Sequence, residues 1–181
     1  MIRLFAALPI PADVADRLAG LQKGLEGRLV PPENFHVTLA FYGEVHETTA
    51  EDIDAALAEI DAPGCDLWLD GVDAFGGAKP HALYAAVRPD PALDRLQAKT
   101  EQAARRAGVE MPSRRYTPHV TLTRLSKGEL GPEAVARRLS ARAAFLAGPI
   151  PVRRFALYES HLGRKGPIYT ELADYPLRPP A

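Results

Sequence analysis

The sequence predicts a fold of mixed helices and strands that is built by duplication of one pattern of elements. Its 181 residues suit one domain, or two tightly joined lobes, and are enough to bury a full core. The tetrapeptide His-Val-Thr-Leu occurs twice, at residues 36–39 and 119–122. The same order of elements is predicted around each copy: strand, helix, histidine-containing strand, helix and strand. We therefore interpret residues 1–181 as a single domain with internal repeats at approximately 1–80 and 81–181.

The elements of the first repeat follow from apolar runs and from the residues that interrupt them. An apolar run at residues 2–8 predicts a buried strand, because prolines follow it directly. Apolar residues at helical spacing predict a helix between residues 11 and 27. After the first tetrapeptide strand, Thr48 or Thr49 is the expected N-cap of a second helix. A last apolar stretch at residues 67–72 predicts a strand.

The second repeat shows the same order and adds a closing strand. We expect its elements at residues 83–87 (strand), 93–108 (helix), 119–122 (second tetrapeptide strand), 132–145 (helix), 150–158 (strand) and 168–172 (strand). An arginine-rich loop at residues 112–118 precedes the second tetrapeptide, and a loop at 161–166 separates the closing strands. Duplication of this kind predicts a pseudo-twofold arrangement, with the two tetrapeptide strands placed symmetrically about a cleft.

Each tetrapeptide alternates polar and apolar residues, so its His and Thr share one face of the strand while Val and Leu point the other way. Residues two positions apart in a strand lie about 6.6 Å from one another. The imidazole and the hydroxyl of one copy can therefore lean towards the same small anion. His36 with Thr38 and the second pair, His119 with Thr121, would surround that anion if the fold brings the two copies together.

Paired histidines of this kind are suited to cleaving a phosphodiester. The unperturbed pKa of histidine, about 6.5, lets the side chain donate or accept a proton near neutral pH. Hydrolysis needs a base that takes a proton from water and an acid that protonates the departing oxygen. Threonine hydroxyls can hold the other phosphate oxygens, and a cation can neutralise their charge. Arg124, five residues after His119, is the best candidate for this cation; the alternative is a surface charge at a strand end.

Paired histidines have two other interpretations. Metal binding is the main one, but the sequence has no His-x-x-x-His or Cys-x-x-Cys grouping, so we favour an acid and a base without metal. The other is a pair of core histidines that hydrogen bond to the backbone, and the repeated threonine argues against it. The lone Cys65, beside a strand-like run, is predicted to be a buried structural thiol rather than a nucleophile.

The charge of the chain is unevenly distributed. The net charge is −1, which argues against a strongly basic coat for nucleic acid. Residues 1–80 hold 5 Lys and Arg against 14 Asp and Glu, whereas the remainder holds 17 against 9. The second half could attract polyanions, or its charges could lie on solvated helix faces. Because the chain shows no charged-then-apolar leader and no long apolar run, we expect a cytoplasmic protein without a membrane partner.

These motifs and their flanks resemble those of a known family. The paired His-x-Thr-x motifs are similar to those of the two-histidine phosphoesterases. The flanks resemble more closely the bacterial and archaeal RNA 2′,3′-cyclic phosphodiesterases, once called 2′-5′ RNA ligases. The stretches that carry this resemblance are RLFAALPIP from Arg3, NFHVTLAFYGEV from Asn34, PHVTLTR from Pro118 and LYESHLG from Leu157. One departure is His161, where relatives are expected to have a small or basic residue.

The resemblance implies a bilobal α+β fold, in which two antiparallel sheets backed by helices have the active-site cleft between them. It also implies a substrate, RNA with a terminal 2′,3′-cyclic phosphate. From the residue pattern itself we expect no metal or other cofactor. By similarity, the two His-x-Thr pairs would grip the cyclic phosphate, with Arg124 on its oxygens. Hydrolysis would leave a 2′-phosphate, with His119 as the base towards water and His36 as the acid towards O3′. Members of the family can also run the reverse 2′-5′ joining reaction.

Four further residues are candidates for RNA contacts. Phe41 and Tyr42, just beyond the first motif, could stack on a terminal base, although core packing is an alternative for Phe41. Arg114 and Arg115 could touch the RNA backbone or lie in a solvated loop. Two other functions stay open, which are hydrolysis of small cyclic nucleotides and non-catalytic binding of RNA ends. A monomer is expected.

Overall fold

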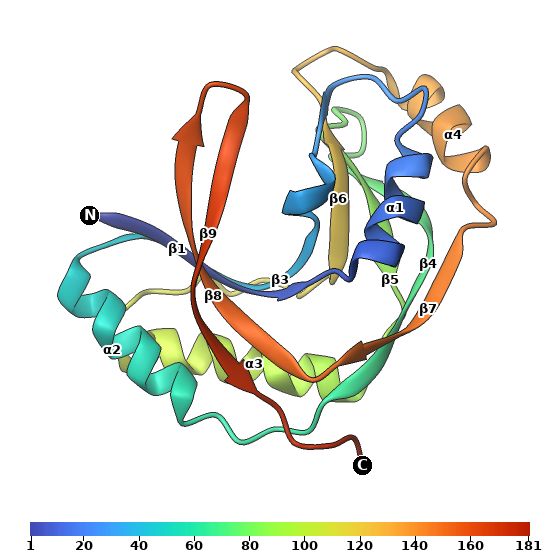
Figure 1. Ribbon diagram of the computed structural model, residues 1–181. Helices are drawn as coiled ribbons and strands as arrows, with labels where there is room; N and C mark the ends of the chain where they lie inside the picture. Colours follow the sequence, from blue (N-terminus) through green and yellow to red (C-terminus); the bar gives the residue numbers. More distant parts are fainter.

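Two antiparallel β-sheets form the frame of the protein in the structure, a computed structural model that describes residues 1–181 (Figure 1). The first sheet has the strand order β3-β1-β8-β9 and the second the order β2-β6-β5-β4-β7. The strands are β1 (Ile2–Pro9), β2 (Arg28–Leu29), β3 (His36–Val45), β4 (Cys65–Phe75), β5 (Ala82–Val87), β6 (His119–Arg124), β7 (Leu146–Val152), β8 (Arg154–Gly163) and β9 (Gly166–Pro176). The helices are α1 (Ala12–Leu21), α2 (Glu47–Ala58), α3 (Pro91–Arg106) and α4 (Pro132–Ser140), with a 3₁₀ turn η1 (Pro32–Asn34). The predicted α+β fold of two antiparallel sheets with helices is confirmed.

The hydrophobic core is one cluster of 36 buried residues that draws on both sheets and all four helices. β1 is buried along most of its length because it lies between β3 and β8 inside the first sheet. α3 begins where the Asp90 carboxylate accepts hydrogen bonds from the backbone N–H groups of Ala92 (2.8 Å) and Leu93 (3.1 Å). None of the four helices has the length and apolar character that a membrane crossing requires.

Two helices are shorter than the sequence predicts. α1 ends at Leu21, short of the predicted residue 27, because Gly24 and Gly27 adopt φ angles of +79° and +89° that do not fit a helix. The last helix, α4, ends at Ser140 instead of residue 145, because the residues after it turn the chain into β7. The apolar spacing in the sequence continues beyond the last residue of each helix, because residues that follow a helix can still pack against the core. The spacing alone therefore predicted helices that were too long.

The predicted N-cap of α2 is wrong. The helix begins at Glu47 with His46 at the N-cap, in place of Thr48 or Thr49. β3 extends as far as Val45, so the chain passes from strand to helix within one residue and leaves no room for a longer connection. The acidic side chain in the first turn still suits the helix dipole.

The single strand predicted at residues 150–158 is two strands that lie in different sheets. β7 pairs with β4 in the second sheet, whereas β8 pairs with β1 in the first. Arg153 stands between them, and its guanidinium donates a hydrogen bond to the Cys65 carbonyl (3.0 Å). Pro149 and Pro151 fit in β7 because that strand lies at the edge of its sheet.

The loop predicted at residues 161–166 is mostly strand. β8 continues to Gly163 and β9 begins at Gly166, so only Arg164 and Lys165 form the turn. The resulting β8–β9 hairpin projects beyond the other strands of the first sheet (Figure 1). His161 therefore lies in a strand, where its Nε2 is 3.3 Å from the Glu159 carboxylate.

The repeated pattern is visible in the fold, but the sheets do not divide the chain at residue 80. The units β1-α1-β3 and β5-α3-β6 correspond, because each histidine strand pairs with the strand before it. β4 from the first repeat, however, joins the second sheet, and β8 from the second repeat joins the first. Each sheet thus takes two strands from the other half of the chain: the first sheet takes β8 and β9, and the second takes β2 and β4.

Candidate active site

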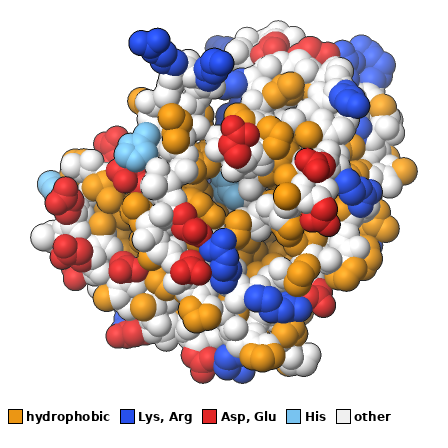
Figure 2. Space-filling view, in the orientation of Figure 1, with side chains coloured by type: hydrophobic (Ala, Val, Ile, Leu, Met, Phe, Trp, Pro, Cys, Tyr) orange, Lys and Arg blue, Asp and Glu red, His pale blue; other side chains and the backbone are white.

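The two tetrapeptide strands meet at the boundary between the sheets. β3 is an edge strand of the first sheet, and the Tyr116 hydroxyl, just before β6, donates a hydrogen bond to the Thr38 carbonyl (2.7 Å). Two cavities adjoin there: the His36-side cavity of about 330 Å³ and the His119-side cavity of about 610 Å³. Both are lined by Thr38, Thr121 and Arg124. Figure 2 shows a hollow at this place with a histidine at its base.

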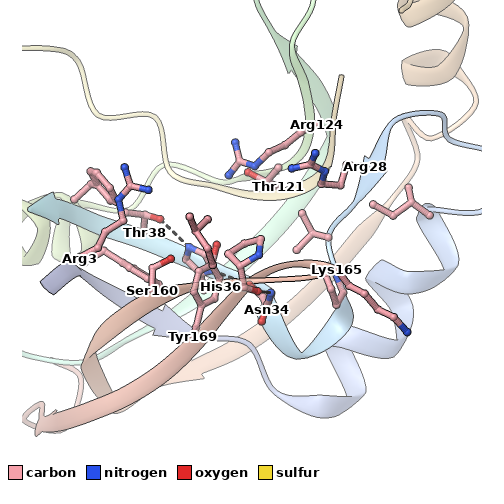
Figure 3. A pocket seen from close by; sticks show the side chains of 17 residues that line it. Arg3, Arg28, Asn34, His36, Thr38, Thr121, Arg124, Ser160, Lys165 and Tyr169 are labelled. Atoms are coloured by element: carbon pink, nitrogen blue, oxygen red, sulfur yellow. Dashed lines mark hydrogen bonds between the residues drawn. The ribbon is translucent and has the colours of Figure 1, made fainter. Parts of the chain in front are cut away.

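His36 is held in a defined orientation by its neighbours in sequence. Its Nδ1 donates a hydrogen bond to the Asn34 carbonyl oxygen (2.7 Å), which can only accept. The neutral ring therefore has its lone pair on Nε2, which lies 3.0 Å from Oγ1 of Thr38 (Figure 3). Phe5 and the edge of Tyr169 pack against the ring at centroid distances of 5.0 and 5.4 Å.

His119 is held in the corresponding way. Its Nδ1 donates to the Thr117 carbonyl at 2.6 Å, again two residues earlier in the chain. Phe75 and Tyr84 pack around the ring at centroid distances of 4.8 and 5.1 Å. Both motif histidines therefore have a backbone acceptor on one nitrogen, an aromatic wall beside the ring, and Nε2 as the nitrogen that is left for chemistry.

The two histidines and Arg124 influence one another electrostatically. Burial, together with the positive charges of Arg124 and of a protonated His119, lowers the pKa of His36 to about 4, although the hydrogen bond to the Asn34 carbonyl acts in the opposite direction. Burial and the nearby Arg124 also lower the pKa of His119, although the Thr117 carbonyl acts in the opposite direction. Both imidazoles are therefore neutral at pH 7 in the free protein, and a bound anion would favour their protonation.

The His36-side cavity is strongly positive. Four cationic side chains line it, and no Asp or Glu does; the four are Arg3, Arg28, Arg124 and Lys165 (Figure 3). None of them forms an ion pair with an acidic side chain of the protein. The Arg3 guanidinium instead lies over the ring of Phe41, 5.7 Å from its centroid. Such a cavity is suited to an anionic ligand.

The four candidates for RNA contacts have different surroundings. Phe41 is 49% exposed and lines both cavities, and the exposed Arg114 and Arg115 line the His119-side cavity. Tyr42, however, is buried, and its hydroxyl donates to the Thr100 carbonyl (3.1 Å), so the prediction that it contacts RNA is wrong. The reason is a register shift between β1 and β3 after Thr38, which reverses the alternation and turns position 42 into the core.

Sequence reasoning missed several residues of the site. Arg28, Asn34 and Tyr169 line the His36-side cavity, but no repeated pattern marks them. Asn34 and Tyr116 could have been recognised from their position in the sequence, because each lies within three residues before a motif histidine. Cys65 is buried, and burial raises its pKa to about 11, in keeping with a structural thiol. No group of three or more His, Cys, Asp or Glu side chains comes together in a way that could hold a metal ion.

Known proteins are similar to this chain over most of its length. A family model described as the 2′-5′ RNA ligase superfamily matches residues 10–164. The RNA 2′,3′-cyclic phosphodiesterase of Bacillus subtilis is 31% identical, over 96% of this chain and 95% of the relative. The protein of the same name from Archaeoglobus fulgidus is 28% identical, over 94% and 98%.

Solved structures show the same fold. Apo LigT of Escherichia coli superposes with a TM-score of 0.76 at 27% identity, covering 98% of each chain. A protein of Thermus thermophilus gives a TM-score of 0.78 at 28% identity, also covering 98% of each chain. With the matched family model, the paired motifs and this fold, the chain belongs to the 2′-5′ RNA ligase superfamily of two-histidine phosphoesterases.

Proposed function

We propose that the protein hydrolyses the 2′,3′-cyclic phosphate at the end of an RNA to a 2′-phosphate, with paired histidines as acid and base. The observation that carries this proposal is the matched setting of His36 and His119 about shared Thr and Arg side chains, each with Nδ1 bound to a backbone carbonyl. The relatives named RNA 2′,3′-cyclic phosphodiesterase support the same reaction. LigT of Escherichia coli has also been solved in complexes with 3′-AMP and with phosphate.

In the proposed reaction, Nε2 of His119 takes a proton from water as the water oxygen attacks phosphorus. The bond from phosphorus to O3′ breaks on the opposite side, and O3′ receives a proton from Nε2 of His36. Thr38, Thr121 and Arg124 hold the non-bridging oxygens, whose negative charge grows in the transition state. His36 must enter this reaction protonated, and the bound anionic phosphate would raise its pKa from the low value of the free protein.

Two features favour this assignment of roles over the reverse. The cation-lined cavity lies beside His36, and the ribose that bears O3′ would enter on the side of the acid. Nε2 of His36 also lies 3.0 Å from the Thr38 hydroxyl, which can donate to the neutral ring in the free protein and can accept from the imidazolium once a bound phosphate has raised its pKa. Reversal of the same steps on suitable RNA ends would form a 2′-5′ bond.

A defined RNA end tests this proposal. We expect an oligonucleotide with a terminal 2′,3′-cyclic phosphate to give the 2′-phosphate product, resolved by chromatography against the 3′-phosphate standard. Activity should survive EDTA, because the site offers no cluster of metal ligands. Binding of the oligonucleotide without turnover would instead identify a non-catalytic RNA-end binder. Loss of activity in EDTA with recovery on added metal would contradict the metal-free mechanism.

A further inference from the structure

The His36-side cavity carries more positive charge than one cyclic phosphate requires. A cyclic phosphodiester bears a single negative charge, which Arg124 alone can neutralise. Arg3, Arg28 and Lys165 line the same cavity, where no acidic side chain balances them. In an RNA end, the next anionic group is the phosphate that joins the terminal nucleotide to its neighbour.

We propose that Arg28 binds this second phosphate, so that the protein selects RNA ends over the cyclic phosphates of free nucleosides. The inference rests on the proposed function, because it takes the cyclic phosphate to lie between the two motif histidines. It assigns to Arg28 a role in substrate binding and leaves Arg124 as the cation of the reacting phosphate.

The first support is the position of Arg28 relative to Arg124. The two residues are directly opposite in the short pairing of β2 with β6. Residues opposite each other in antiparallel strands have Cβ atoms about 4.5–5.5 Å apart on one face, and like charges there repel. Figure 3 shows both guanidinium groups at one wall of the cavity, across from His36 and Thr38. Anions beside this pair would offset the repulsion.

The second support is the way in which the segment that carries Arg28 is fixed. Gln22 is only 7% exposed, and its amide donates to the Leu122 carbonyl in β6 (2.9 Å). Gly27 comes so close to β6 that a Cβ there would lie 2.5 Å from the Arg124 carbonyl oxygen. β2 itself has only two residues, so these contacts hold Arg28 against β6. A solvated loop has no need of such a close approach.

The third support is the side of the reaction on which Arg28 lies. In the proposed mechanism O3′ departs towards His36, so the ribose and the RNA chain extend into the His36-side cavity. That cavity, of about 330 Å³, is within the size range of small-molecule sites. The β8–β9 hairpin continues the wall outwards, with Lys165 lining the cavity and basic side chains at the hairpin tip in Figure 2. An RNA backbone leaving the cavity would meet this positive charge.

A comparison of three substrates distinguishes the effect of the second phosphate from that of the reacting one. The substrates are adenosine 2′,3′-cyclic phosphate, its 5′-phosphorylated form, and a dinucleotide that ends in a cyclic phosphate. We expect the wild type to have a higher kcat/KM for the two that carry the extra phosphate. Arg28→Ala should reduce this preference by about ten- to a hundredfold, as for loss of a charged hydrogen bond. Arg28→Lys should restore much of it. Arg137→Ala, an exposed arginine of α4 outside both cavities, should keep the wild-type preference.

Equal losses on all three substrates in Arg28→Ala would place Arg28 on the cyclic phosphate itself and overturn the inference, as would a wild type without any preference. A wild type that hydrolyses none of them would contradict the proposed function instead. Calorimetry with adenosine 2′-phosphate and adenosine 2′,5′-bisphosphate then still decides the role of Arg28. Tighter binding of the bisphosphate that Arg28→Ala removes would support it, and equal affinities would overturn it.

Discussion

At the scale of single residues, each motif histidine has a backbone carbonyl where many catalytic histidines have a carboxylate. The carbonyls of Asn34 and Thr117 fix the ring orientation without adding a negative charge. We therefore expect the imidazoles themselves to be indispensable. His36→Ala and His119→Ala should each lower kcat by at least about a hundredfold, with a smaller effect on substrate binding.

Steady-state kinetics on a cyclic-phosphate oligonucleotide would check this expectation. His46→Ala is the matched control, because His46 is exposed at the start of α2 and its side chain forms no capping hydrogen bond. Near-normal turnover in either motif variant would contradict the acid and base assignment.

The pH dependence of activity follows from the lowered histidine pKa values. kcat/KM reports the free enzyme, in which the pKa of His36 is about 4 and that of His119 is also lowered. Because the acid must be protonated, kcat/KM should decrease with rising pH, and this decrease should begin below 6.5, the unperturbed pKa of histidine. In the complex the phosphate anion favours the imidazolium, so the basic limb of kcat should lie at higher pH. Parallel pH profiles of the two constants measure this difference. A flat profile from pH 5 to 9 would be incompatible with paired histidines.

What the sequence could reveal about single residues depended on repetition. The two His-x-Thr pairs were identifiable because the same tetrapeptide occurs twice, and the structure places the two copies at adjoining cavities that share Thr38 and Thr121. Arg28 was not identifiable, because its importance comes from a two-residue pairing with a distant strand that leaves no pattern in the sequence. Tyr42 was misplaced because a register shift interrupts the alternation that a regular strand would show.

At the scale of elements, the contact between the loop before β6 and the edge strand β3 joins the two motif strands. The Tyr116 hydroxyl donates to the Thr38 carbonyl at 2.7 Å. Burial raises the pKa of Tyr116, so this hydroxyl remains a donor throughout the pH range of activity. Tyr116→Phe should lower the free energy of unfolding by about 1 kcal/mol, since the carbonyl loses its partner. It should also lower kcat, because the spacing of the two motif strands becomes less constrained.

Urea unfolding and steady-state kinetics measure the two effects of Tyr116→Phe. Tyr158→Phe in β8 provides a matched control, because its ring stacks on Phe5 and its hydroxyl forms no hydrogen bond with the protein. We expect the control to stay within about 0.5 kcal/mol of the wild type. If both variants behave alike, the hydroxyl of Tyr116 does not hold the strands together.

The kinds and order of the elements were predictable, whereas their bounds and partners were not. Hydrophobic spacing records which residues face the core, and β7 and β8 face one continuous core, so they read as one strand. Arg153 separates them through contacts with β4, which is far away in sequence. The exchange of strands between the two halves of the chain likewise depends on pairing between residues that are far apart in sequence.

At the scale of the whole molecule, this exchange joins the two sheets into one unit. β4 of the first half lies between β5 and β7 of the second half, and β8 of the second half pairs with β1 of the first. The cluster of 36 buried residues continues through both sheets. Neither sheet can come apart without releasing a strand that the other half of the chain supplies. The protein should therefore unfold in a single cooperative transition.

Two optical probes test the cooperativity. Trp68, the one tryptophan of the chain, lies in β4, so its fluorescence reports on the second sheet, and far-ultraviolet circular dichroism reports on the whole protein. We expect the same urea midpoint and the same slope from both probes. The double variant Trp68→Phe, Tyr158→Trp moves the fluorescent reporter to β8 in the first sheet and should again give coincident transitions. A midpoint that changes with the position of the tryptophan, while circular dichroism of the two proteins agrees, would mean that the sheets unfold separately.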